Sequence, residues 1–445
     1  MPNDPKAMKV RVESSRLVKP SYEGHPPPTT LRVPLSVFDK VTYNTHIAVI
    51  YAFRPPTPCN STVEKGLSMV LSEYREWAGR LGKDPKGNPV ILLNDEGVRF
   101  IEASAETTLD KAMPFKPSAA LLSFHPSLHG VAELVQVQLT RFTCGSLMVG
   151  FTAHHLVADG HATSNFLVAW GRSSRGLAID PLPLHDRTTF FVPRSPPKLE
   201  FKHRGVEFTS KNKFDKGKED PLKDDIVVSK VHFTKEFLNK LKAQASLGSK
   251  SNRPHTTFES LVAHLWRVVT KARGLDGCET TQVRISVNGR TRLSPRVPNE
   301  YFGNLVLWAF PRAKVAELIS QPLQFAAELI HDEVAKVNDG YFRSFIDFAS
   351  SGVVQSENLS PTADMGKSVL CPDLEVDSWL RFPFYDLDFG GGSPPYYFMP
   401  SYFPVEGMLF ILPSSMGDSS IDAFVPLFCH NVDAFKHNCY SLVLA

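Results

Sequence analysis

The sequence is short of the features that mark several large classes of protein. It has only six cysteines in 445 residues, and no two of them form a CxxC pair. This scatter excludes a zinc-finger pattern and argues against a disulfide-stapled extracellular domain. The 49 basic residues are almost balanced by 46 acidic ones, which leaves a net charge of only +3. Proteins that neutralise nucleic-acid phosphates usually carry a larger positive excess, so we expect no nucleic-acid partner.

Long apolar runs and targeting signals are missing as well. No apolar stretch approaches the roughly 18 residues that a membrane-spanning helix needs. The first ten residues, MPNDPKAMKV, contain neither the apolar core of an export signal nor a basic amphipathic presequence. Hydrophobic residues make up 42% of the chain and charged residues 21%, the balance of a globular protein. We therefore expect a cytoplasmic protein that does not associate with membranes.

Several common catalytic motifs are absent too. The sequence contains no GxSxG nucleophile elbow, no P-loop, no HExxH zinc motif and no glycine-rich turn that leads into a helix. The triplet Gly390–Gly392 is followed by Ser393, Pro394 and Pro395, which cannot open a dinucleotide-binding helix. His154, His155 and Asp159 offer a possible metal ligand set with no clear further member. We therefore expect neither a metal nor a permanently bound cofactor.

The hydrophobic pattern that is present predicts an α/β protein of two similar-sized domains, because strands and helices alternate in both halves. Helical spacing is found at 64–81, 161–171, 234–246, 257–273 and 322–337, and strand-like runs at 47–53, 134–140, 146–153, 283–288, 303–310, 408–413 and 421–429. A segment rich in proline and charge separates the halves. We interpret it as a solvated crossover linker at 196–226, between domains at 8–195 and 227–445.

One histidine stands out for its sequence context. His155 follows an almost wholly apolar strand and precedes Asp159-Gly160, where the chain must turn before a helix. A histidine at such a strand end can present its imidazole to a cavity, where its near-neutral pKa suits proton abstraction. An HxxxD pair alone is weak, since about one is expected by chance in a chain with fifteen histidines. A catalytic base and a buried, hydrogen-bonded core histidine are about equally compatible with the pattern.

Two further stretches could contribute to a site. The segment 379–403 is dense in aromatic residues, which could wall an aryl pocket or hold a cation over ring faces, or could simply be sheet core. Arg290 and Arg292 follow a β-rich run. Either could neutralise a buried aspartate such as Asp388 or reach a cofactor phosphate, although an exposed turn is an equally good interpretation.

Taken together, these motifs resemble those of a known family. His155-Leu156-Val157-Ala158-Asp159-Gly160 in the first half and Asp388-Phe389-Gly390-Gly391-Gly392 in the second are similar to the paired signature of the plant BAHD acyl-CoA-dependent acyltransferases. The segments 35–39, 78–81 and 301–304 agree with that family as well. The resemblance covers essentially the whole chain from Met8, and within the family it is strongest to the cereal agmatine and tryptamine hydroxycinnamoyltransferases.

The resemblance implies a fold, a reaction and a set of site residues. The fold would be two chloramphenicol-acetyltransferase-like domains with an active-site channel between them. His155 would be the general base, and Asp388 a second motif residue that shapes the domain interface through Arg290 or Arg292. Asp159 would turn from the cavity towards an arginine. The other structural motif residues would be Gly160, Phe389, Gly390, Gly391 and Gly392. The general family has tryptophan in place of Gly391, so this glycine would remove a large side chain near the site.

The substrates implied are an aromatic acyl-CoA as co-substrate and an amine acceptor such as agmatine or tryptamine. The implied product is a phenolic amide, and an ester of shikimate or quinate is the alternative. The substrate-binding candidates are Asp377, Trp379, Tyr385, Tyr301 and Asn304, and Asp373 and Glu375 could add counter-charge. Relatives that use shikimate or quinate carry an arginine before the second motif, whereas residues 344–380 contain none. We expect a monomer whose only partners are these small molecules.

Overall fold

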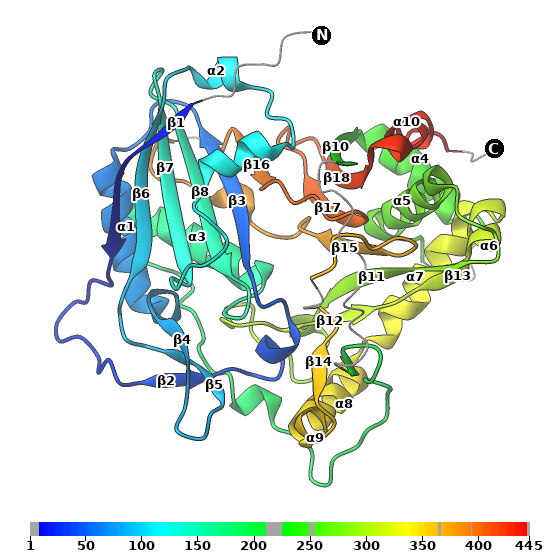
Figure 1. Ribbon diagram of the computed structural model, residues 1–445, viewed down its shortest axis with the longest axis horizontal. Coiled ribbons are helices and arrows are strands. Elements are labelled where there is room, and N and C mark those ends of the chain that lie inside the picture. Colours follow the sequence, from blue (N-terminus) through cyan, green and yellow to red (C-terminus); the bar gives the residue numbers. More distant parts are fainter. Residues whose placement is uncertain (1–8, 211–224, 249–252, 364–365, 393, 443–445) are drawn as a thin grey trace.

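Two large β-sheets dominate the computed structural model, which describes residues 9–210, 225–248, 253–363, 366–392 and 394–442 (Figure 1). The first sheet has six strands in the order β1 (Val10–Val18), β6 (Val98–Ala105), β7 (Val135–Phe142), β8 (Leu147–His154), β3 (His46–Phe53) and β16 (Tyr397–Pro400). Neighbouring strands in it run antiparallel, except for the parallel pair β6–β7. This half of the molecule positions the predicted histidine.

Strand β8 is buried along its whole length because both faces of the first sheet are covered. On one face lie α1 (Asn60–Glu73) and α3 (Gly160–Ser174), which are locked together by a hydrogen bond from the Trp170 indole N–H to the Val63 carbonyl (2.9 Å). A 3₁₀ helix at Ala119–Phe124 approaches the other face at Gly150. A strand buried on both sides reads as a continuous apolar run, as 146–153 does.

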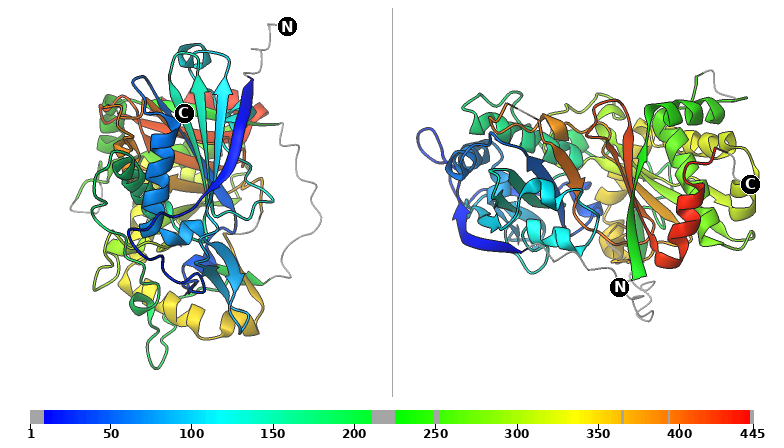
Figure 2. Two further views of the ribbon diagram at one scale, coloured as in Figure 1. Left: turned by 90° about the vertical axis from the view of Figure 1, so that its left-hand side faces the viewer. Right: turned by 90° about the horizontal axis from the view of Figure 1, so that it is seen from above.

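The second sheet forms the other half of the molecule. Its strands follow the order β10 (Ile226–Phe233), β18 (Ile421–Phe428), β17 (Met408–Pro413), β15 (Leu374–Ser378), β11 (Thr280–Asn288) and β12 (Val306–Ala309), and β13 (Arg312–Lys314) pairs with β11. The helices packed in the core of this half are α4 (Lys235–Ala245), α5 (Thr257–Arg273), α6 (Val315–Ser320), α7 (Leu323–Lys336) and α10 (Cys429–Asn438). The two halves lie side by side when the molecule is seen from above (Figure 2).

The remaining helices and strands complete the fold. They are α2 (Leu109–Ala112), α8 (Asp339–Ser350), α9 (Val353–Ser356), the three-stranded sheet of β2 (Arg32–Pro34), β5 (Pro89–Leu92) and β4 (Arg80–Lys83), and the pair β9 (Phe208–Ser210) and β14 (Leu359–Pro361). The α/β class and the two-part architecture predicted from the sequence are confirmed.

The division of the chain at a single linker is wrong in one respect. Strand β16, expected in the second domain, is the edge strand of the first sheet and pairs with β3 from Tyr397↔Ala52 to Pro400↔Val49. Phe384, Phe389 and Phe398 are buried in the core of the first half. Burial of each such ring stabilises the fold by about 1.5–3 kcal/mol, which is enough to favour the packing of this segment against the first half of the molecule. The aromatic segment is therefore partly sheet core, as the simpler interpretation had it.

The predicted linker is exposed over residues 196–202, as expected of a solvated crossing, but it is buried at His203 and Glu207. Residues 211–224 of it lie outside the described part of the chain. In the described part, His203 and Glu207 are fully buried, with His203 Nδ1 3.0 Å from Glu207 Oε2. Glu207 also accepts a hydrogen bond from the Tyr341 hydroxyl of α8 (2.6 Å). Polar residues in a sequence favour exposure, but His203, Glu207 and Tyr341 bond to one another in the interior.

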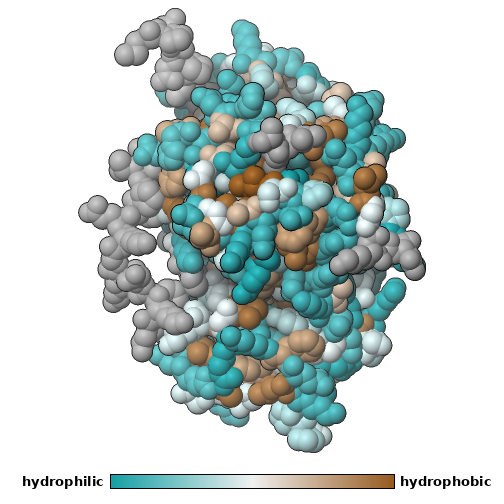
Figure 3. Space-filling model, turned by 90° about the vertical axis from the view of Figure 1, so that its right-hand side faces the viewer, coloured by the Kyte–Doolittle hydropathy of each residue, from teal (hydrophilic) through white to brown (hydrophobic). Residues whose placement is uncertain are grey.

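The surface and the helices each add one observation. Hydrophilic side chains predominate on the face at the right of Figure 1, where hydrophobic residues lie in small groups (Figure 3). Among the described residues, no helix combines the length and the apolarity that crossing a membrane would require.

Candidate active site

A large cavity lies between the two sheets. Its walls come from β3 and the segment before it, from the loop after β8, from the start of α3 and from β12, β15 and β17 of the second sheet. Its empty volume is about 1290 Å³, counting space that is open to solvent. Most of the lining is apolar or aromatic, with a few polar groups, which is typical of a small-molecule site. His155, Asp377 and Trp379 line it, as the sequence predicted.

His155 is held by hydrogen bonds from both halves of the molecule. Its backbone N–H donates to the Thr45 carbonyl (2.9 Å), and its carbonyl accepts from the side-chain amide of Asn304 (2.9 Å). Its ring Nδ1 lies 3.2 Å from the hydroxyl of Thr42. When Nδ1 carries the proton and donates it to this hydroxyl, Nε2 keeps its lone pair for a substrate. Burial lowers the pKa of His155, so the ring is neutral and able to accept a proton.

Asp159 does not face His155. It is the N-cap of α3, with Oδ1 accepting from the Ala162 N–H (2.9 Å) and Oδ2 from the Leu305 N–H (3.0 Å). Its main partner is Arg290, whose Nη1 lies 2.7 Å from Oδ2, and both side chains are buried. Burial alone would raise the pKa of Asp159, but Arg290 holds it below the ordinary value. The carboxylate is thus a structural anchor, and it has no capacity left for a metal.

A second buried pair supports the same region. Asp39 accepts from Arg187 Nη1 (2.7 Å) and from both the backbone and the side-chain N–H of Asn304 (3.0 and 2.9 Å). Arg187 donates in turn to the carbonyl of Val157 in the loop that carries His155 (2.8 Å). Asn304 therefore connects Asp39 to the His155 backbone, so that the base is positioned by two buried ion pairs rather than by its own strand alone.

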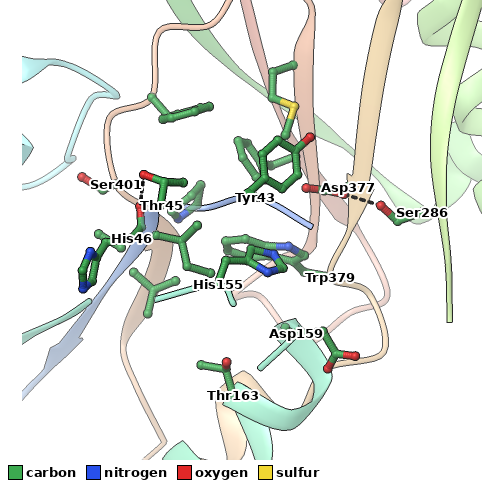
Figure 4. A pocket seen from close by; sticks show the side chains of 18 of the residues that line it. Tyr43, Thr45, His46, His155, Asp159, Thr163, Ser286, Asp377, Trp379 and Ser401 are labelled. Atoms are coloured by element: carbon green, nitrogen blue, oxygen red, sulfur yellow. Dashed lines mark hydrogen bonds between the residues drawn. The ribbon is translucent and has the colours of Figure 1, made fainter. Parts of the chain in front are cut away.

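An acidic cluster lies across the cavity from the first sheet. Asp377 of β15 accepts a hydrogen bond from Ser286 of β11 (2.7 Å), and Glu375 accepts one from the Tyr43 hydroxyl. Arg284 is the one nearby cation in the described residues, with Nη1 3.7 Å from Glu375 Oε2. Its guanidinium stacks on the Trp308 ring at 3.9 Å. Figure 4 shows Asp377 and Ser286 to one side of His155, and Thr45 and Ser401 to the other.

The charges of this cluster do not balance. Glu375 and Asp377 supply two carboxylates against the single guanidinium of Arg284. Burial raises the pKa of both carboxyl groups, which means that their ionised forms are held at a cost. A cation that entered the cavity beside Asp377, which lines it, would remove that cost.

The partner predicted for Asp388 is wrong. Neither Arg290 nor Arg292 contacts it in the described residues. Asp388 instead pairs with Arg175, the C-cap of α3 (2.8 Å), and accepts from the Gly390 N–H (2.8 Å). Arg290 was attractive because it follows a strand of the same half, but Asp159 already binds it. The second motif is therefore fixed to the far end of α3, and Asp388 does not line the cavity.

Several other predicted residues do not line the cavity. Tyr385, Tyr301 and Asn304 lie away from its surface, and the last two are buried beneath it. Gly391 packs where a Cβ would come within 2.2 Å of the Pro56 carbonyl oxygen, so a tight backbone contact explains its lack of a side chain. The expectation that this glycine enlarges the site is wrong, because it lies in a small pocket beside Asp388. Phe389 packs edge-on against Trp170 (4.7 Å between ring centroids).

Several functional residues carry no recognisable signal in the sequence. Thr42, Tyr43, Arg284 and Ser286 lie on different elements, with ordinary local context. Only the fold brings Thr42, Tyr43 and Ser286 to the cavity wall, and Arg284 to within 3.7 Å of Glu375. One trio of potential metal ligands among the described residues, His255, Glu259 and His331, lies between α5 and α7 and does not line the cavity.

Comparison with known proteins identifies the family. The sequence pattern of the Transferase family matches residues 8–442. Agmatine coumaroyltransferase-1 of Hordeum vulgare is 55% identical over 441 residues, covering 98% of this chain and 100% of that protein. Putrescine hydroxycinnamoyltransferase 3 of Oryza sativa subsp. japonica is 54% identical, with 98% and 100% coverage. Shikimate O-hydroxycinnamoyltransferase of Nicotiana tabacum is only 30% identical, with 97% and 100% coverage.

The fold has solved counterparts as well. The crystal structure of F. sporotrichioides TRI101 complexed with coenzyme A and T-2 matches with a TM-score of 0.74 at 18% identity, over 91% of this chain and 97% of that one. Such a low identity supports the fold alone. The match along nearly the whole sequence, with the two motifs in place, shows that the chain belongs to the Transferase family, that of the plant BAHD acyltransferases.

Proposed function

We propose that the protein transfers a hydroxycinnamoyl group from its coenzyme A thioester to the primary amine of a cationic acceptor such as agmatine or putrescine, to give a phenolic amide. The observation that carries this proposal is the acidic cluster of Asp377, Glu375 and Arg284, of which Asp377 lines the same cavity as the neutral histidine His155. The relatives named for agmatine and putrescine transfer, at 54–55% identity, support the same reading.

The reaction follows from the position of His155. The acceptor nitrogen attacks the thioester carbonyl carbon, a C–N bond forms, and the carbonyl π electrons move to the oxygen. His155 Nε2 takes a proton from that nitrogen. The oxyanion then collapses, the C–S bond breaks and coenzyme A leaves as the thiolate, which recovers a proton from the imidazolium. Thr42 keeps the ring oriented throughout. A thioester is already activated, so the steps need no resident cofactor.

The reacting nitrogen must release one proton to solvent to become a neutral nucleophile before His155 takes a second one, and the other end of the acceptor can keep its charge. An aliphatic diamine, or an amine that carries a guanidinium group at its other end, is cationic at both ends at neutral pH. Only the reacting nitrogen has to become neutral. The remaining cation would match the one uncompensated carboxylate at Asp377. Tryptamine has no second cationic group, so this charge balance favours agmatine or putrescine over it.

Esterification of shikimate or quinate remains the alternative, and the charges oppose it. A carboxylate acceptor would lie beside Asp377 and Glu375, and Arg284 is already engaged by Glu375. The relative named for shikimate transfer is also much more distant, at 30% identity.

The residues that line the cavity support an aromatic acyl group as the donor. Phe382, Phe384, Phe403 and Phe410 contribute an aromatic wall suited to the aryl group of the acyl chain. Acyl-CoA as co-substrate is also consistent with the coenzyme A bound in the TRI101 structure. We further propose that the protein works as a cytoplasmic monomer with small-molecule substrates only, since hydrophilic residues predominate on the surface of Figure 3.

The first test is the reaction itself. Purified protein mixed with coumaroyl-CoA and an equimolar pool of agmatine, putrescine, tryptamine and shikimate should yield mainly the agmatine or putrescine amide by mass spectrometry. His155→Ala should lower kcat by about 10²- to 10⁴-fold, the usual worth of a positioned base. His154→Gln, which alters the neighbouring imidazole outside the cavity lining, is the control and should keep its activity. Ester products in place of amides would contradict the proposal.

Asp377→Asn tests acceptor recognition. The asparagine can still accept from Ser286, but the negative charge is lost. A hydrogen bond to a charged group is worth about 1.5–3 kcal/mol, so the KM for agmatine should rise about 10- to 100-fold. The KM for tryptamine should change little, which steady-state kinetics with both amines would reveal. Asp386→Asn, an exposed change nearby, is the control. An equal rise in KM for both amines would show that Asp377 does not distinguish the acceptors by their second positive charge.

The pH dependence of kcat tests the base. The pKa of His155 is lowered by burial, so the ring stays deprotonated at the pH where an ordinary histidine is half protonated. With saturating amine, kcat should therefore be maintained down to about pH 6.5 and fall only below it. Stopped assays between about pH 5 and pH 8 would measure this. A midpoint above 6.5 would contradict the assignment of His155 as a buried neutral base.

A further inference from the structure

One buried hydroxyl of the cavity wall has no protein partner. Thr163 lies in the first turn of α3, is 4% exposed and lines the cavity. Its Oγ1 makes no hydrogen bond within the described part of the chain. Leaving a buried hydroxyl unpaired costs about 1–3 kcal/mol, so such a group normally bonds to a protein group or a water, and one without a protein partner at a cavity wall is available to a ligand. In Figure 4 the Thr163 oxygen points towards the space below His155.

The neighbouring residue, Ser164, shows the hydrogen bond that a hydroxyl inside a helix usually makes. Ser164, which is fully buried, donates its hydroxyl to the carbonyl of His161 one turn back (2.7 Å). Near the other end of α3, Ser174 does the same with the Trp170 carbonyl (2.9 Å). Thr163 has preceding carbonyls of its own helix within the same reach. Its hydroxyl nevertheless stays unpaired at the cavity surface.

The same place is the positive end of a helix. The cavity is lined by Gly160 and Thr163, at the start of the fifteen-residue helix α3. The N–H groups of a first helical turn have no intrahelical acceptor, and the helix dipole favours negative charge there. Asp159 does not cancel this field, because Arg290 pairs with its carboxylate. Thr163 and the start of α3 together would therefore stabilise an anion that develops near His155.

We propose that Thr163 is a catalytic residue: its hydroxyl donates a hydrogen bond to the thioester carbonyl oxygen as that oxygen becomes negative. This inference rests on the proposed acyl transfer and names a donor for it. When the acceptor nitrogen adds to the carbonyl carbon, the electron pair of the C=O bond moves to oxygen, and Thr163 Oγ1–H stabilises it until the C–S bond breaks. No proton is transferred from Thr163, so its hydroxyl is unchanged at the end of the cycle.

Thr163→Val tests the assignment, because valine keeps the shape and removes the O–H. We expect kcat with coumaroyl-CoA and agmatine to fall about 10²-fold, the lower end of the loss when one oxyanion donor is removed. The KM values for both substrates should stay within about threefold, since the hydrogen bond strengthens only in the transition state. Thr163→Ser, which keeps the hydroxyl, should retain most of kcat.

Ser164→Ala is the matched control: it removes the adjacent hydroxyl, which the helix uses, and should leave kcat near that of the wild type. Thermal unfolding of each variant reports whether α3 is intact. A Thr163→Val protein that folds and keeps its kcat would overturn the inference. A raised KM for agmatine with unchanged kcat would do so too, by making Thr163 an acceptor contact. Wild-type protein that transfers no acyl group would instead refute the proposed function on which the inference rests.

Discussion

The ion pair between Asp159 and Arg290 is the interaction on which the site depends. It joins the loop after β8 of the first sheet to the 3₁₀ turn Gly289–Thr291 after β11 of the second. Removing one partner of such a buried pair costs about 3–5 kcal/mol, because the other charge is left uncompensated. Asp159 also accepts from Ala162 and Leu305, so the same carboxylate starts α3 and fixes the segment after Asn304. The position of His155 follows from these contacts.

Helix α3 connects the two sequence motifs physically. Its N-terminal end carries Asp159 and lies at the cavity, whereas its C-cap, Arg175, holds Asp388 of the second motif. Gly171 allows the backbone of Asp388 to pack directly on the helix, where a Cβ would come within 2.6 Å of the Asp388 carbonyl oxygen. The second motif thus fixes the end of α3 that lies away from the cavity. Further along the same segment, β16 pairs with β3 as the edge strand of the first sheet (Figure 1).

The chemistry of the cavity is divided between its two sides. The side of the first sheet supplies the proposed base, His155, and the Thr42 hydroxyl that contacts its ring, from the segment before β3. The second sheet supplies the acidic cluster on β15, and Arg284 on β11 neutralises part of the negative charge of that cluster. Neither sheet alone contains both a proton acceptor and a counter-charge for a cationic substrate. The arrangement explains why one cavity between two sheets can hold an acyl thioester and an amine together.

Sequence patterns predicted the local structure of this protein better than its long-range contacts. Helical spacing located α3, α5 and α7 closely, and the HxxxD context placed His155 at a strand end. Motif resemblance identified the family, and the acidic residues before the aromatic run pointed to Asp377. The predicted partner of Asp388 was wrong because ion pairing depends on which elements meet, and Arg175 lies more than two hundred residues earlier in the chain. Tyr301 and Asn304 match the family motif, but burial makes them supports rather than substrate contacts.

The central claim is that the Asp159–Arg290 pair, by joining the two sheets, holds His155 in place. The most direct test measures thermal unfolding and kcat for Arg290→Met, Asp159→Leu and the double variant. Each single variant should be destabilised by about 3–5 kcal/mol and nearly inactive. The double variant should recover much of the stability but not kcat, because the Ala162 and Leu305 N–H groups still lack their acceptor. An Arg290→Met protein with wild-type stability and kcat would contradict the account.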